Sequence, residues 1–168
     1  NASKSGITAE AVTRVMIDPI EDIAISGTIS MSLSSGLKDA VSISATILPN
    51  DLTNLVAEIN KVSQLTGVNA TLFSDKKRLI LENVDADDIK ISNFSAPGIG
   101  ETTATVLNQL YRSTSSSITL GSTSANNSAV FTGVIKLQSA VDFALTSTDS
   151  ASNLSGSAVI TGFIGSET

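Results

Sequence analysis

The strongest constraint on this chain is the alternation of Ile, Val and Leu with small polar residues, chiefly Ser and Thr. A period of two places every second side chain on the same face of a strand, so each such run predicts a strand with one buried face. The apolar positions of the clearest runs are Ile23, Ile25, Ile29, Met31 and Leu33; Val41, Ile43, Ala45 and Ile47; Val68, Ala70 and Leu72; Leu79 and Leu81; and Ile89 and Ile91. Gly27, inside the first run, is expected at a bulge or a close-packing point. Further runs predict strands near residues 118–120, 129–137, 141–145 and 158–164.

One segment follows a helical period instead. Its apolar residues recur at spacings of three and four, which predicts an amphipathic helix over about residues 51–65. Asn50 is the expected N-cap, Asp51 lies in the expected first turn, and Gly67 is placed to end the helix. A second pattern, over about residues 103–112, fits a short helix, with a strand or an irregular segment as the alternatives. The predicted fold is mainly β with α (α+β), with small antiparallel sheets covered by one amphipathic helix.

The composition removes whole classes of chemistry. The chain contains no His, Cys or Trp. Without His there is no Ser–His pair and no imidazole ligand, and without Cys there is no disulfide, thiolate nucleophile or Cys-based zinc site. Serines are abundant, but the sequence has no Gly-x-Ser-x-Gly elbow and no Gly-rich phosphate-binding loop. We therefore expect no enzyme, no cofactor, and no catalytic, cofactor-binding or metal-binding residues.

Nucleic acid and membrane are not expected as partners. Lys and Arg total 10 against 16 Asp and Glu, for a net charge of -6, whereas phosphate binding depends on clustered basic residues. The basic cluster Lys76–Arg78 follows Ser74-Asp75 in an expected hairpin turn, where charges are usually solvated. No segment approaches the ~18 consecutive apolar residues of a membrane helix.

Two acidic groups are the remaining candidates for chemistry. Asp85–Asp88, with Glu82 nearby, could offer oxygen ligands to calcium, but the EF-hand spacing and its Gly are missing. The segment Asp18–Asp22 could supply a carboxylate pair for glycoside hydrolysis, but the chain lacks Trp to stack a sugar. A solvated turn is the favoured interpretation of the first group, and a Pro-containing turn between strands that of the second.

A longer pattern joins the predicted helix to the strands after it. Asn50–Asn60 (NDLTNLVAEIN) is followed by Thr66–Thr71 (TGVNAT), Arg78–Leu81 (RLIL) and Asp87–Ile91 (DDIKI). In this order and spacing the segments resemble the flagellin hook IN motif: an Ile-Asn helix ending, a Thr-Gly-Val-x-Ala strand, a short hydrophobic strand and an Asp-Ile-x-Ile strand. The resemblance covers about residues 41–94. The motif occurs in middle regions of bacterial flagellins and in hook-associated proteins.

The resemblance implies a structural role for this chain, as a fragment of a longer protein. Residues 1–168 would be the variable outer (middle) domain of a flagellin, either whole or divided into two subdomains. These would be an IN-motif-like β-helix-β unit over about residues 16–112 and a β-rich unit from residues 1–15 plus 113–168. The long terminal helices through which flagellins polymerise are absent from the sequence.

The same resemblance implies a place and partners. The domain would be extracellular, on the bacterial flagellum, and would serve motility. Its partners would be neighbouring copies of the same subunit in a filament. Flagellin surfaces often carry O-linked glycan, which makes Ser113–Ser117 and Ser122–Ser128 candidates for modification. The alternatives are a domain of a hook–filament junction protein, and a phage tail or adhesin-type binding module.

Overall fold

The computed structural model describes residues 7–19, 23–97, 102–106, 117–121 and 126–139. The chain divides into two compact units, residues 12–133 and residues 1–11 with 134–168. The described strands are β1 (Ile7–Pro19), β2 (Gly27–Ser35), β3 (Val41–Ile47), β4 (Asn69–Leu72), β5 (Leu79–Asn83), β6 (Ile89–Ser95), β7 (Thr102–Val106), β8 (Ser117–Leu120), β9 (Ala129–Phe131) and β10 (Val134–Ser139). The described helices are α2 (Thr53–Lys61) and α3 (Ser63–Thr66). The predicted class, mainly β with α, is confirmed.

The larger unit contains two antiparallel arrangements of strands. One sheet has the order β3-β2-β6-β9, and the other follows the order β4-β5-β1-β7-β8. β8 and β9 lie within residues 12–133, whereas the sequence had grouped them with the β-rich subdomain of residues 113–168. In the smaller unit, β10 pairs with β1. The strands predicted at residues 141–145 and 158–164 lie outside the described residues.

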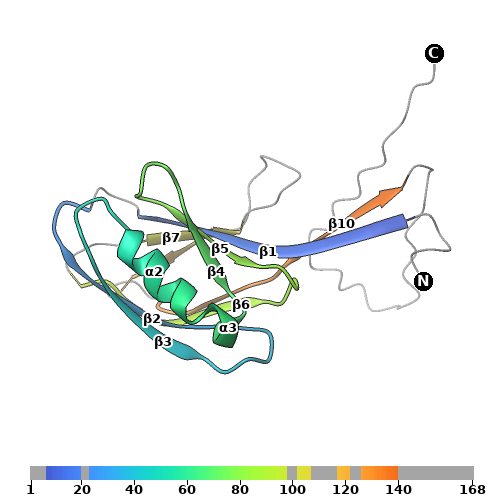
Figure 1. Ribbon diagram of the computed structural model, residues 1–168, viewed down its shortest axis with the longest axis horizontal. Helices are drawn as coiled ribbons and strands as arrows, with labels where there is room; N and C mark the ends of the chain where they lie inside the picture. The colour runs from blue at the N-terminus through green and yellow to red at the C-terminus, as the bar shows by residue number, and fades with distance from the viewer. Residues whose placement is uncertain (1–6, 20–22, 98–101, 107–116, 122–125, 140–168) are drawn as a thin grey trace, which may run out of the picture. The chain divides into compact units, whose positions relative to one another are not determined.

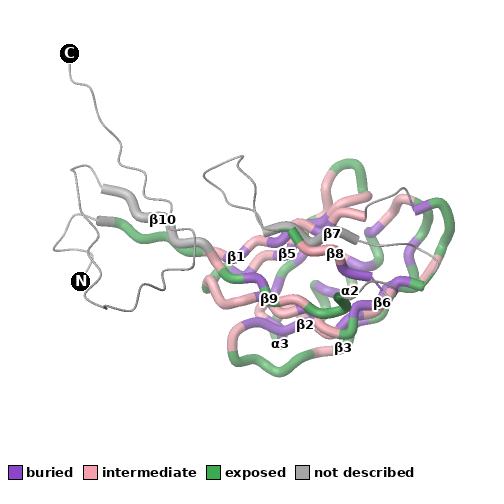
Figure 2. The backbone as a smooth tube through the Cα atoms, turned by 180° about the vertical axis from the view of Figure 1, so that it is seen from behind, coloured by how far each residue is buried: buried purple, intermediate pink, exposed green. Residues whose placement is uncertain are grey.

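Because apolar and polar residues alternate along the strands, each sheet has a buried face and a more exposed face. β2 and β3 pair in unbroken register from Gly27↔Ile47 to Leu33↔Val41, so their apolar residues face one way and their hydroxyls the other. Figure 2 shows buried stretches within the strands of the larger unit and exposed stretches at its turns. The inward side chains of both sheets form one cluster with those of α2, including Val15, Leu33, Ile47, Leu55, Ile59, Leu79, Leu81 and Ile91.

The helix closes one side of this core. Figure 1 shows α2 running between the β2–β3 hairpin and β4. Near its start, Asn54 donates from Nδ2 to the carbonyl of Thr46 on β3, 2.9 Å away. Near its end, Asn60 bonds the backbone of Ala70 on β4. β3 and β4 are edge strands, and unpaired strand edges invite further pairing. α2 therefore covers part of both edges.

The helix differs from the prediction in its length. We expected one helix over residues 51–65, but α2 ends at Lys61 and α3 begins at Ser63. The N–H of Val62 donates to the carbonyl of Ile59, three residues back. This bond interrupts the α-helical pattern, in which each N–H donates to the carbonyl four residues back. Gly67 ends α3 with a φ of 72°, a left-handed conformation that glycine adopts without strain.

Three other expectations are corrected. Residues 102–106 form the strand β7, paired with β1 and β8, so the short helix expected over 103–112 is wrong there and the strand alternative is confirmed; residues 107–112 lie outside the described part. Gly27 pairs regularly with Ile47, and the irregularity lies between Ser30 and Ser32 in the pairing of β2 with β6. Ile25 lies before β2 and is exposed, whereas Ile23, two residues earlier, is buried, so the alternation expected from Ile23 onward begins only with the strand.

Candidate functional site

The residues that carried the family resemblance meet at the end of α2. Ile59 is fully buried in the core. Asn60, beside it, donates from Nδ2 to the carbonyl of Ala70 at 2.9 Å and accepts the Ala70 N–H at Oδ1 at 2.8 Å. A side-chain amide places N–H donors beside a carbonyl acceptor, in the same spacing as a peptide group. Asn60 thus takes the place of a neighbouring strand on the outer edge of β4.

A cluster of buried polar residues, which we call the polar knot, links three connecting segments by hydrogen bonds. It consists of Ser35, Thr66, Gly67 and Asn83. Ser35 Oγ donates to the Thr66 carbonyl at 2.6 Å, and Asn83 Nδ2 lies 3.0 Å from Ser35 Oγ and 2.9 Å from the Gly67 carbonyl. The side chains of Ser35, Thr66 and Asn83 are fully buried. The knot joins the β2–β3 turn, the end of α3 and the β5–β6 turn.

The close packing of the knot restricts what can replace its glycine. A Cβ on Gly67 would lie 2.7 Å from Ser35 Oγ and 2.7 Å from Lys38 Nζ. Its positive φ adds a second reason for glycine at this position. The sequence predicted Gly67 as a helix end, but it did not identify Ser35 or Asn83. Ser35 bonds Thr66 and Asn83, 31 and 48 residues away, and Asn83 bonds Gly67, 16 residues away, so no local pattern predicts these contacts.

The basic cluster Lys76–Arg78 lies in the turn between β4 and β5, as the sequence predicted, but two of its charges are paired instead of only solvated: Lys76 with Asp51 and Arg78 with Asp75. Asp75 Oδ1 accepts the N–H groups of Lys77 and Arg78 at 3.0 and 3.3 Å, and the Arg78 side chain bonds Asp75 Oδ2. The Arg78 guanidinium also lies 4.8 Å from the ring centre of Phe73. The hydrogen bond from Arg78 is the main cause that lowers the pKa of Asp75 below its ordinary value.

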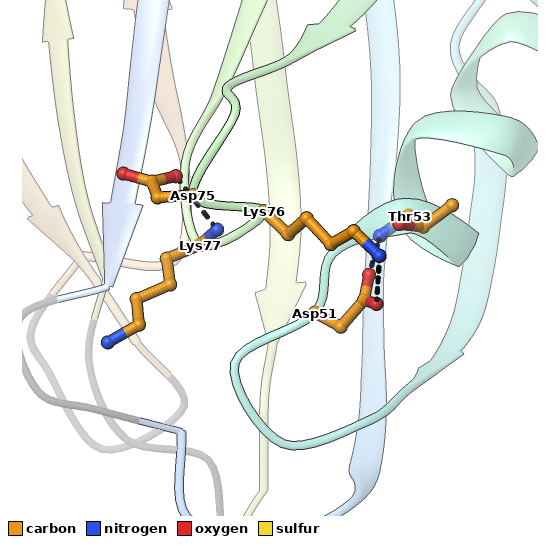
Figure 3. Close-up of polar contacts among 5 residues, drawn as sticks. All are labelled: Asp51, Thr53, Asp75, Lys76 and Lys77. Carbon is orange, nitrogen blue, oxygen red and sulfur yellow. Dashed lines mark hydrogen bonds and ion pairs between the residues drawn. The ribbon is translucent and has the colours of Figure 1, made fainter.

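The start of α2 is held by Asp51, and the predicted N-cap Asn50 is wrong. Asp51 Oδ1 accepts the N–H of Thr53 at 2.8 Å, while Oδ2 lies 3.4 Å from Lys76 Nζ (Figure 3). These contacts, the Thr53 hydrogen bond first, lower the pKa of Asp51. Asn50 has a φ of 52° and accepts the N–H of Ile23 instead, because its side chain serves a segment distant in sequence.

Residues of the first acidic group, Asp85–Asp88 with Glu82, take part in contacts that hold the fold together. Asp87 donates its N–H to Asn83 Oδ1 at 2.9 Å, the Asp88 carbonyl accepts from Gly36, and Glu82 forms an ion pair with Arg14 across β5 and β1. Among the described residues, no three His, Cys, Asp or Glu side chains are grouped closely enough to hold a metal ion. Of the second acidic group, residues 20–22 lie outside the described part.

The candidate glycan segments fall mostly outside the described residues. Residues 113–116 and 122–125 are not described, whereas Ser117 begins β8 and residues 126–128 lead into β9. In the described part of the chain, no helix is long and apolar enough to span a membrane. Comparison of the chain with models of known protein families and with curated proteins finds no match.

Proposed function

We propose that this chain is a structural, non-catalytic domain of an extracellular bacterial filament, of the kind found on the outside of flagellins. Its partners are neighbouring copies of the same subunit, and its role is to form part of the filament surface in motility. Nucleic acid, membrane and cofactor have no part in this proposal.

The observation that carries the proposal is the way the motif residues serve one another. Ile59 is buried in the core, and Asn60 hydrogen-bonds the backbone of Ala70 at the edge of β4. The carbonyl of Gly67 accepts a hydrogen bond from Asn83 Nδ2. Each of these contacts stabilises a turn or an edge. The charged groups of the adjoining hairpin are paired in the same way, as Asp75 with Arg78 and Asp51 with Lys76. This use of polar residues suits a scaffold domain more than a reactive site.

The test is to locate the protein in the cells that make it. Filaments sheared from the cell surface are digested with trypsin and searched by mass spectrometry for the peptides Val62–Lys76 and Leu79–Lys90. We expect both peptides in the filament fraction, as abundant as the main filament protein. Trace amounts in that fraction would indicate the junction-protein alternative. Recovery only from phage particles or the cell envelope would refute the proposal in favour of a binding module.

The gene provides a second, independent test. We expect its translated sequence on both sides of residues 1–168 to contain long helices rich in Ala, Leu and Gln, since flagellins polymerise through such segments. A signal peptide or fibre repeats in the same places would count against a flagellar subunit.

A further inference from the structure

Asparagine side chains have two kinds of surroundings in the described part of the chain. Some hydrogen-bond distant segments and begin no Asn-x-Ser/Thr sequence: Asn50, Asn54, Asn60 and Asn83. Others begin such a sequence and are exposed: Asn69, Asn93 and Asn126. Asn-x-Ser/Thr is the acceptor sequence for N-linked glycan on exported proteins. The asparagines that hold the fold together are therefore separate from those that fit the acceptor sequence.

Asn93 lies at an irregularity of β6. The pairs Ser32↔Ser92 and Ser30↔Ser95 advance by two residues on β2 but by three on β6, so β6 contains one extra residue between them. Asn93 has a φ of 54°, a left-handed conformation that asparagine adopts more readily than most residues. We therefore place a β-bulge at Asn93.

The bulge turns the Asn93 side chain outward. Ile91 and Phe94 are both buried, at 2% and 3% exposed, although a regular strand would place residues three apart on opposite faces. The extra residue accounts for the difference, and Asn93 is exposed beside a buried phenylalanine. Ser95, which completes the acceptor sequence, is partly exposed. Within the described part of the chain, neither the Asn93 amide nor the Ser95 hydroxyl makes a hydrogen bond.

Asn69, by contrast, lies in a regular strand. It begins β4, whose residues 69–72 pair with β5 in continuous register. On the opposite edge of β4, the Asn60 side chain bonds both the N–H and the carbonyl of Ala70. A modifying enzyme has to bind the acceptor segment apart from its neighbours, which costs less where fewer backbone bonds hold that segment. Asn69 is therefore an internal comparison for Asn93.

The backbone at Asn93 is held less tightly. The pairing of β9 with β6 ends at Ile91, and beyond it the Asn93 N–H lies 3.4 Å from Ser128 Oγ, which is long for a hydrogen bond. The facing residues 126–128 are themselves exposed. They form another acceptor sequence, but its Ser128 hydroxyl is already engaged, because it also donates to Asn127 Oδ1 at 3.0 Å. Of the described acceptor sequences, the one at Asn93 is the most accessible.

We propose that Asn93 is the acceptor for an N-linked oligosaccharide, with Ser95 as the hydroxyl residue of its acceptor sequence. The side-chain amide nitrogen of Asn93 forms a bond to the anomeric carbon of a sugar carried on a lipid diphosphate. The bond from that carbon to the diphosphate oxygen breaks, the lipid diphosphate leaves with the electron pair, and the amide proton passes to a base of the transferase. The inference goes beyond the proposed function, since it requires only that the chain is exported.

The test is mass spectrometry of the protein purified from the cells that make it. The tryptic peptides 62–76 and 91–112 contain Asn69 and Asn93, respectively, so one digest measures both positions. Fragmentation of the intact glycopeptide locates the sugar on a particular residue. We expect the sugar on Asn93 in peptide 91–112 and none in peptide 62–76. An unmodified Asn93, a sugar on a hydroxyl instead, or equal modification of Asn69 would overturn the proposal.

Variants made in the same cells separate acceptor recognition from folding, which circular dichroism checks. Ser95→Ala keeps Asn93 and should lose the sugar, whereas Ser95→Thr retains a hydroxyl and should keep it. The matched control Thr71→Ala alters the acceptor sequence of β4 and should leave the sugar on Asn93. Sugar retained in Ser95→Ala, or lost in a folded Ser95→Thr, would contradict the assignment. Modified peptide 91–112 from protein outside filaments refutes only the proposed function; bare peptide from filaments refutes only this inference.

Discussion

Replacing Asn60 with alanine tests whether its amide really stands in for a strand beside β4. The substitution removes both hydrogen bonds to Ala70 and leaves that residue's N–H and carbonyl without their partner at the strand edge. Ala70 is only 7% exposed, so water replaces the amide poorly. At about 1 kcal/mol net for each hydrogen bond, the loss is about 2 kcal/mol. Alanine favours a helix over asparagine by about 0.5 kcal/mol, so we expect a net loss of about 1.5 kcal/mol.

Urea denaturation of the 168-residue chain, followed by circular dichroism, measures this change. For a domain of this size the loss corresponds to a decrease in Tm of about 3–6 °C. Asn54→Ala is the matched control, because Asn54 lies in the same helix and makes one hydrogen bond, to Thr46. The same reasoning gives it a loss of about 0.5 kcal/mol.

The test is whether Asn60→Ala lowers the stability more than Asn54→Ala. If Asn60→Ala costs no more than Asn54→Ala, the two bonds to Ala70 do not contribute as argued. Asn60→Asp separates polarity from shape, since the carboxylate still accepts the Ala70 N–H but has no donor for its carbonyl. At neutral pH this variant should be no more stable than Asn60→Ala, and a wild-type Tm would contradict the two-bond arrangement.

Three further predictions concern buried and charged groups. Thr13 is fully buried and its hydroxyl has no hydrogen-bond partner among the described residues, so Thr13→Val should stabilise the chain by about 1 kcal/mol, and a lower Tm would contradict this. Asn83→Ala leaves the Gly67 carbonyl and the Asp87 N–H unpaired and should destabilise by about 3 kcal/mol in urea denaturation. The pKa of Asp51 is lowered in the folded state, so its stabilisation is present above the unfolded pKa and disappears as pH falls through the folded pKa. Tm measured from pH 7 to pH 2 should therefore show a difference between wild type and Asp51→Asn that shrinks in acid.

Sequence reasoning worked where the determining pattern was local. The period of two placed Ile29, Leu33 and Ile43 correctly in the core, because each strand faces a single apolar layer. Over residues 102–106 the local pattern favoured a helix and left a strand only as an alternative, because the strand is defined by pairing with β1 and β8, which are distant in sequence. Asn50 was mistaken for an N-cap because its residue type suits that position, whereas its side chain bonds Ile23.

The candidate site was less predictable than the fold, for a related reason. The helix ending at Asn60 was visible in the sequence, but its bond to Ala70 was not. The polar knot involves Asn83 and Ser35, whose spacing follows from the packing of two sheets. The exposure of Leu37 was equally hidden, since an apolar residue between two strands is more often buried than presented to solvent.

In the described part of the chain, asparagine side chains link distant segments at four positions. Asn50, Asn54, Asn60 and Asn83 each bond the backbone of a segment 8 to 48 residues away or a side chain fixed to it. The amide offers a donor and an acceptor without a charge, so it can satisfy buried peptide groups with little of the desolvation penalty that Asp or Lys would bring. A chain without Cys cannot fix distant segments by disulfides. The amides do so by hydrogen bonding, which is why we expect stability to respond more strongly to Asn60 and Asn83 than to the exposed carboxylates.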